Sequence, residues 1–227
     1  MRQRIAALTA LLTLCVPATA ALAADGGVSP GDPIPGSNAG WLTASAAGVS
    51  LKAPINALGG NTHVATGSVG RGRTRVSLER QSGNGAWTRI GSANSASSGS
   101  YRVSWNVNVF GPVKLRVTAA GHGGQPSGTI MSFRRANATI FGGPSEYQAA
   151  ACGGRIAKGT MGLAHKTLPC GTLVRVSYGQ RSMVLPVIDR GPYRTGYTWD
   201  VTYDAAKYLH MTGSGVIGYL ISGRDGT

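Results

Sequence analysis

The chain has 227 residues, of which 42% are hydrophobic and only 13% are charged, and its formal net charge is +14. This charge favours polyanionic partners through long-range attraction, although it can also serve solubility alone. No segment has the pattern of a nucleic-acid-binding module, so we expect no nucleic acid among the partners.

The first 23 residues have the pattern of an export signal. Arg2 and Arg4 precede the apolar run Ile5–Val16, and Ala21–Ala23 supplies a small-x-small cleavage pattern. The run is too short to span a bilayer, so we expect no stable membrane span once residues 1–23 have been cleaved off. An uncleaved anchor is the alternative. The prediction is a secreted or cell-wall location, where the nearby polyanions are wall polymers and lipid headgroups.

Cleavage of the signal would remove one of the three cysteines, Cys15, and leave Cys152 and Cys170. Two cysteines in an exported chain favour a disulfide bond. Two buried free thiols are the alternative.

A Gly-, Pro- and Ser-rich leader is expected at residues 24–40, followed by a β-sandwich domain at residues 41–134. Apolar and polar residues alternate in three strips, at 74–80, 101–107 and 113–117, with turn residues between them. This pattern predicts an antiparallel, immunoglobulin-like sandwich without an inter-sheet disulfide, and Trp87 and Trp105 are expected in its core.

The predicted sandwich offers little for catalysis. Glu79 is its one acidic residue, and neither a carboxylate cluster nor a Cys/His set lies within it. We therefore assign it a spacer or binding role. Arg71, Arg73 and Arg75 are candidates for contact with an anionic polymer, with an ordinary solvated strand edge as the alternative.

The second domain is predicted at residues 135–227. Strands are expected at 139–142 and 215–221, and a hairpin at 172–188 around Gly179-Gln180. Thr202 is a candidate N-cap for a short helix through Ala205, Ala206 and Leu209. Many short strands with one short helix indicate a small closed barrel, so the whole chain is predicted to be mainly β.

Two motifs in this domain suggest chemistry. One is Ala164–Thr172, which contains His165, and the other is Val187–Tyr193, which contains Asp189 and is followed by Trp199-Asp200. Of only eight acidic residues, three lie within this short stretch: Asp189, Asp200 and Asp204. Such clustering favours a catalytic role for at least one of them. Asp204 has an alternative role in the first turn of the helix.

These motifs, in this order and spacing, resemble the rare lipoprotein A (RlpA-like) family of septal-ring lytic transglycosylases. The resemblance covers about Ala138 to Ile221 and implies a six-stranded double-psi β-barrel that cleaves peptidoglycan glycan strands between N-acetylmuramic acid and N-acetylglucosamine, without water. It implies catalytic roles for His165 and Asp189. The family's catalytic Glu would fall near Gly154, which is not acidic. The stretch around Cys152 resembles a disulfide-bearing branch of the family, in which Cys152 pairs with Cys170.

Asp189 and Asp200 also resemble the pair of acids in expansins and their endoglucanase relatives, which makes Asp200 an alternative acid. Asp189 has a rival role as a turn-capping residue. Tyr193 and Trp199 are candidates for stacking on sugars or for core packing, and Arg190 is a candidate substrate contact. Glu146 is a candidate substitute for the missing Glu.

Two functions are therefore expected to compete. One is a lytic transglycosylase, and the other is a non-catalytic, expansin-like protein that binds or loosens wall polysaccharide. Neither needs a cofactor, and the scattered histidines show no metal-ligand spacing, so no metal is expected.

Overall fold

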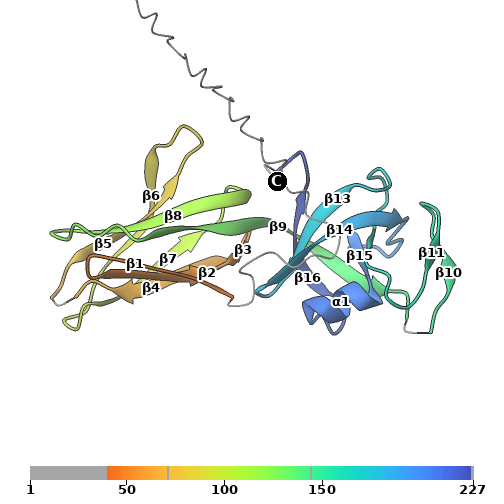
Figure 1. Cartoon of the computed structure of the whole chain (residues 1–227), viewed down its shortest axis with the longest axis horizontal. Helices are drawn as coiled ribbons and strands as arrows, with labels where there is room; N and C mark the ends of the chain where they lie inside the picture. The colour runs from red at the N-terminus through yellow and green to blue at the C-terminus, as the bar shows by residue number, and fades with distance from the viewer. Residues whose placement is uncertain (1–39, 71, 144, 226–227) are drawn as a thin grey trace, which may run out of the picture.

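The computed structural model describes residues 40–70, 72–143 and 145–225. The expected signal peptide and nearly all of the expected leader lie outside these residues. The described part is mainly β, with two lobes and one short helix (Figure 1). No helix in it is sufficiently long and apolar to cross a membrane.

The N-terminal lobe consists of two sheets. The first contains β1 (Trp41–Ala46), β2 (Val49–Pro54), β4 (Thr62–Ser68) and β7 (Ser100–Asn106), in that order. The second contains β6 (Trp87–Asn94), β5 (Arg75–Gln81), β8 (Gly111–Ala119), the first part of β9 (Ser127–Phe141) and β3 (Asn56–Leu58).

The alternating strips predicted from the sequence coincide with β5, β7 and β8. Their apolar residues join one buried core to which both sheets contribute, including Val76, Leu78, Val103, Trp105 and Leu115. Trp87 differs from the expectation, because it is half-buried and its ring lies against Arg116, with 4.2 Å between the guanidinium carbon and the ring centroid. The immunoglobulin-like assignment of this lobe stays a prediction.

The C-terminal lobe is a closed barrel of six strands. Around the barrel these are β15 (Trp199–Thr202), β12 (Leu163–Ala164), β14 (Arg181–Asp189), β13 (Leu173–Tyr178), β16 (Gly215–Ile221) and β9, and β9 pairs again with β15. Two pairings are parallel, β12 with β14 and β9 with β15. A small hairpin of β10 (Gln148–Ala149) and β11 (Arg155–Ile156) lies beside the barrel (Figure 1).

The predicted hairpin and helix of the barrel are confirmed. The helix α1 (Tyr203–Leu209) buries Ala205, Ala206 and Leu209 against the barrel core. Thr202 is its N-cap residue, but the Thr202 hydroxyl accepts a hydrogen bond from the backbone N–H of Gly162, at 3.1 Å, in place of a helical N–H. The first turn of the helix is thereby tied to the chain that enters β12.

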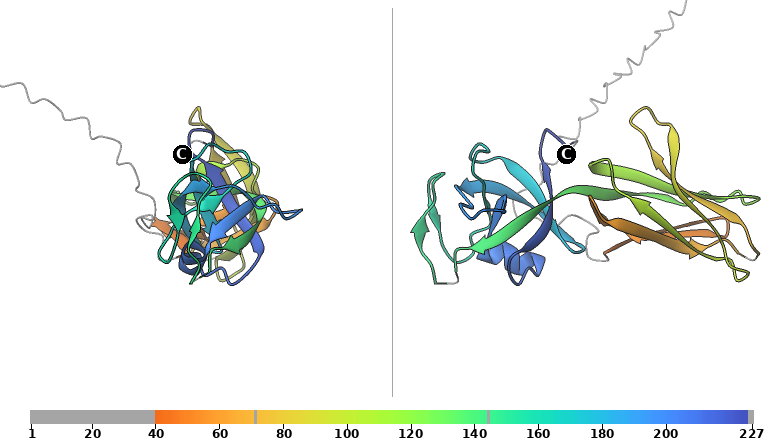
Figure 2. Two further views of the ribbon diagram at one scale, coloured as in Figure 1. Left: turned by 90° about the vertical axis from the view of Figure 1, so that its right-hand side faces the viewer. Right: turned by 180° about the vertical axis from the view of Figure 1, so that it is seen from behind.

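One long strand, β9, belongs to both lobes. Its first part pairs with β8, and its last part pairs with β16 and β15 of the barrel. The domain boundary placed at 134/135 from the sequence therefore falls inside a continuous strand, which runs from one lobe into the other in Figure 2. Arg134 on this strand donates to Asp225 at 2.9 Å, and the side chain of Gln180 accepts the backbone N–H of Asn56 at 3.3 Å. The second of these contacts joins the two lobes.

Candidate functional site

In the barrel, Asp189 and Asp200 lie on the two strands that flank Ala164. Ala164 on β12 is in register with Asp189 on β14 and with Asp200 on β15. Since neighbouring strands lie about 4.8 Å apart, the two aspartates are separated by roughly 10 Å at their Cα atoms. His165 follows Ala164 directly, so the three predicted residues lie at one edge of the barrel.

Asp200 has the environment of a proton-carrying acid. Its side chain is half-buried, and burial raises the pKa of its carboxyl. The hydroxyl of Thr139 donates a short hydrogen bond to Oδ1 of Asp200, which opposes that rise in pKa, and the negative charge of Asp189 adds to it. The protonated form of Asp200 therefore persists to higher pH than in an exposed aspartate.

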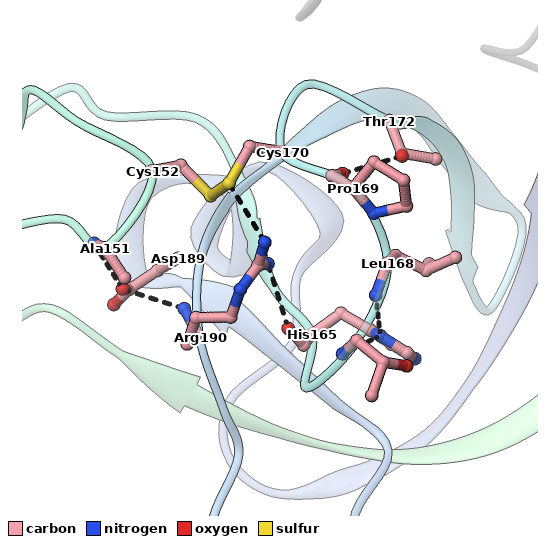
Figure 3. The surroundings of a disulfide bond; sticks show 10 residues. Ala151, Cys152, His165, Leu168, Pro169, Cys170, Thr172, Asp189 and Arg190 are labelled. Atoms are coloured by element: carbon pink, nitrogen blue, oxygen red, sulfur yellow. Dashed lines mark hydrogen bonds between the residues drawn. A yellow bond between two sulfur atoms is a disulfide. The ribbon is translucent and has the colours of Figure 1, made fainter.

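Asp189 is held by the backbone of two loops. Its Oδ1 accepts the N–H groups of Ala151 and Arg190, each at 2.8 Å (Figure 3). The turn-capping role considered from the sequence is thus present. It does not remove Asp189 from the site, because its charge acts on Asp200.

His165 is fixed in one orientation by its own loop. Its Nδ1 accepts the backbone N–H groups of Thr167 and Leu168, at 3.2 and 3.0 Å. Burial and the positive charges of Arg190 and Lys166 lower the pKa of His165. The ring is therefore neutral near pH 7, and with Nδ1 accepting, its proton lies on Nε2. Nε2–H is a donor available to a ligand.

The ring of Trp199 packs against the ring of His165. The two ring centroids lie 4.5 Å apart, and the Trp199 ring also packs on Tyr219 at 5.3 Å. Trp199 has no exposed surface. Of the two roles expected for Trp199, core packing is therefore the one present, because a fully buried ring has no face to offer a sugar. Tyr193 is 83% exposed, so a stacking role remains open to it.

A disulfide bond joins the loops that hold Asp189 and His165. Cys152 follows Ala151 and is bonded to Cys170, with the two Cα atoms 5.5 Å apart (Figure 3). Arg190 lies between the two loops, because it donates to the carbonyl of His165 at 3.3 Å and approaches the sulfur of Cys170 at 3.1 Å. The predicted pairing is therefore present, and Arg190 connects the loops instead of projecting freely toward a ligand.

No carboxylate occupies the position of the family Glu. Gly154 is exposed, with φ of +76°, a backbone conformation that side chains other than glycine rarely adopt. Glu146 does not take its place, since its carboxyl lies near Gly143 and no hydrogen bond in the described structure connects it to His165, Asp189 or Asp200. No cluster of His, Cys, Asp and Glu suited to a metal ion is found among the described residues.

Thr139 is the residue of the site that the sequence did not reveal. It precedes Asp200 by 61 positions, and only the parallel pairing of β9 with β15 places the two in register. A lone threonine in a strand carries no distinguishing pattern.

Comparison with known proteins supports the family assignment of this lobe. Residues 134–220 match a family described as lytic transglycolase. A protein of Aquifex aeolicus named "Probable endolytic peptidoglycan transglycosylase RlpA" is 39% identical over 85 residues, which is 37% of this chain and 38% of that protein. A protein of the same name from Nostoc sp. is 44% identical over 68 residues, which is 29% of this chain and 18% of that protein.

The family match lies within the barrel lobe, and the chain spans well under half the length of either relative. Among solved structures, the BSP domain of a biofilm-associated protein aligns with 78% of this chain and 27% of its own, at 13% identity and a TM-score of 0.26. That similarity is too low to support an argument about the N-terminal lobe.

Proposed function

Because residues 134–220 form an RlpA-like double-psi β-barrel, we propose that this protein is an exported lytic transglycosylase acting on peptidoglycan glycan strands. The observation that carries the proposal is the half-buried Asp200, whose pKa is raised by burial and which lies at the same barrel edge as Asp189 and the fixed His165.

The proposed reaction needs one proton donor. Asp200 protonates the glycosidic oxygen as the bond to C1 of the muramic acid breaks, and so becomes a carboxylate. That carboxylate then accepts the proton of the C6 hydroxyl of the same sugar as O6 bonds to C1. The product carries a 1,6-anhydro end, Asp200 is protonated again, and no water is consumed.

The neighbouring groups have supporting roles in this proposal. The negative charge of Asp189 stabilises the positive charge that develops at C1 of the sugar. Nε2–H of His165 donates to a sugar oxygen, and the exposed ring of Tyr193 stacks on a neighbouring sugar. Thr139 holds Asp200 in place through Oδ1, which leaves Oδ2 for the substrate.

A second function is favoured by Gly154. Without a carboxylate at that position, the barrel can bind glycan strands without cleaving them, as in the expansin-like alternative. In that case Asp189 and Asp200 are binding residues, and the raised pKa of Asp200 has no catalytic consequence.

Mass spectrometry of glycan strands after incubation with the protein separates the two functions. Wild type is expected to release anhydro-ended fragments from strands with or without stem peptides. Asp200→Asn should lower the rate by about 100- to 10,000-fold, the usual contribution of a general acid–base group, while sedimentation with sacculi is unchanged. Binding without any anhydro product from wild type would establish the non-catalytic function.

A further inference from the structure

The two sheets of the N-terminal lobe meet along a seam between β6 and β7. Each is the edge strand of its own sheet, and the described residues form no ladder between them. The strands come close together at Gly91, where a Cβ atom would lie 2.6 Å from the carbonyl oxygen of Ser104. On either side of this contact lies a hollow, one of about 720 Å³ and one of about 400 Å³. The two hollows follow one another along the seam.

Four arginines line this seam. Arg73 and Arg102 border the larger hollow, and Arg80 and Arg89 border the smaller one. None of the four has an ion-pair partner in the part of the chain that the structure describes. The Nε atom of Arg80 is buried and lacks a hydrogen-bond partner there as well.

The positive charge of the seam is not balanced by nearby acids. Glu79 is the only acidic residue between Trp41 and Phe133, and it already binds Arg116 at 2.6 Å. An uncompensated row of guanidinium groups raises the local concentration of anions and binds them in two-pronged hydrogen bonds, for which phosphate geometry is well matched.

The other groups along the seam suit a polymer of phosphates and hydroxyls. Residues with hydroxyl or amide side chains also line the two hollows, namely Ser97, Ser100, Thr88, Ser104 and Asn108. The aromatic residues of the hollows, Tyr101 and Trp105, are 5% and 4% exposed and offer no face for stacking on bases. Proteins that bind single-stranded nucleic acids use such exposed faces, so the seam lacks a feature that base recognition needs.

We propose that the β6–β7 seam is a binding site for an extended phosphodiester polymer of the cell wall. From Ser100 to Asn106, β7 extends roughly 20 Å, which is long enough for several phosphates of an extended chain. This binding does not depend on the lytic activity proposed for the barrel, because the polymer is not the substrate.

The continuous strand β9 connects the proposed polymer site at the seam with the barrel. Since β9 and the hydrogen bond from Asn56 to Gln180 join the lobes, a polymer bound at the seam lies on the same chain as the edge of the barrel that carries Asp200. Two sites on one chain raise the apparent affinity for a wall that contains both polymers, without any new contact.

The test is binding of purified poly(glycerol phosphate) by titration calorimetry over a series of salt concentrations. The seam variant is Arg73→Gln with Arg89→Gln and Arg102→Gln, all three at exposed positions. The matched control removes the same charge elsewhere, with Lys114→Gln, Lys207→Gln and Arg224→Gln. The seam variant should bind at least tenfold more weakly, and the slope of its log binding constant against log salt concentration should fall in magnitude by about two. The control should lose less than threefold in affinity.

Several outcomes would overturn the proposal. Equal losses in both variants would mean that net charge alone attracts the polymer. Unchanged binding with new aggregation of the seam variant, seen by light scattering, would mean that the arginines only protect the sheet edges. An oligothymidylate of the same charge that binds wild type more tightly than poly(glycerol phosphate) would assign the seam to nucleic acid. Thermal unfolding of both variants must match wild type, and Arg102→Gln alone provides a milder variant if the triple one unfolds.

Discussion

Asp189 and Asp200 lie on opposite sides of Ala164, in register with it on β14 and β15, two consecutive strands that flank β12 in the barrel. The charge of the first raises the pKa of the second, while Thr139 lowers it. Two neighbours thus adjust one acid in opposite directions. Each can be removed separately, which makes the proposed role of Asp200 open to direct tests.

Removal of the Thr139 hydroxyl should move the high-pH limb of the pH–activity profile toward higher pH. Thr139→Val keeps the shape of a strand residue but deletes the hydrogen bond that favours the ionised form of Asp200. Asp200 should then remain protonated, and so active as an acid, to higher pH. The measurement is the rate of anhydro-product formation against pH, with Thr139→Ser as the control that retains the hydroxyl. An unchanged profile in Thr139→Val would contradict the assignment of Asp200 as the acid.

Asp189→Asn should shift the high-pH limb of the pH–activity profile toward lower pH. The amide oxygen can still accept the N–H groups of Ala151 and Arg190, so the loop should be kept, but the charge that raises the pKa of Asp200 is lost. The limb should move to lower pH, and the maximal rate should fall because the developing positive charge is less stabilised. If Asp189→Asn abolishes all product while Asp200→Asn does not, the two roles are the reverse of those proposed.

The barrel could be predicted from the sequence because its signals are local. The hairpin of β13 and β14 is marked by apolar strips around Gly179, and helix α1 is marked by the spacing of Ala205, Ala206 and Leu209. The Cys152–Cys170 bond followed from the count of cysteines that remain after the signal. Resemblance to a family then located His165 and Asp189.

What the sequence missed depends on tertiary contacts. The boundary expected at 134/135 separates two strand patterns in the sequence, whereas one continuous strand, β9, is shared by both lobes. Trp199 precedes a candidate acid and suggested a sugar platform, yet the alternation of β15 turns its ring into the barrel core. Thr139 acquires its role only through the register between two strands.

The raised pKa of Asp200 also predicts a pH-dependent stability effect. A carboxyl whose pKa is higher in the folded than in the unfolded state stabilises the fold fully below the unfolded value, and this contribution is lost as pH rises through the folded value. Above the pKa of the unfolded state, wild type therefore pays a cost for its half-buried Asp200 that Asp200→Asn lacks. Asp200→Asn should unfold at a higher temperature than wild type at pH 7, and the difference should disappear or reverse near pH 3. Calorimetric scans at both pH values test this, and a lower melting temperature at pH 7 would contradict it.

His165 should contribute as a donor and, separately, as a support for its loop. In His165→Asn the amide oxygen can replace Nδ1 as the acceptor for Thr167 and Leu168, but the donor at Nε2 is lost. The rate should fall roughly fivefold, as expected for one neutral hydrogen bond of about 1 kcal/mol, with little change in melting temperature. His165→Ala should lose both functions and melt at a lower temperature. Equal activity of His165→Asn and wild type would leave His165 with a structural role alone.

Reduction of the Cys152–Cys170 bond should impair catalysis more than binding to the seam. The bond closes the loop between residues 152 and 170, and in the chain-entropy model a loop of this length contributes about 3 kcal/mol to stability. Without it, Ala151 and the His165 loop are no longer held together, so Asp189 and His165 should lose their fixed positions. Cys152→Ser with Cys170→Ser should therefore melt at a lower temperature and yield less anhydro product at temperatures where it stays folded. Its affinity for poly(glycerol phosphate) should match that of wild type, because the seam lies in the other lobe. A thiol titration of unfolded, unreduced wild type should find no free group at these positions. An equal loss of anhydro-product formation and of polymer binding in the double variant would show that the bond stabilises the whole chain rather than the site.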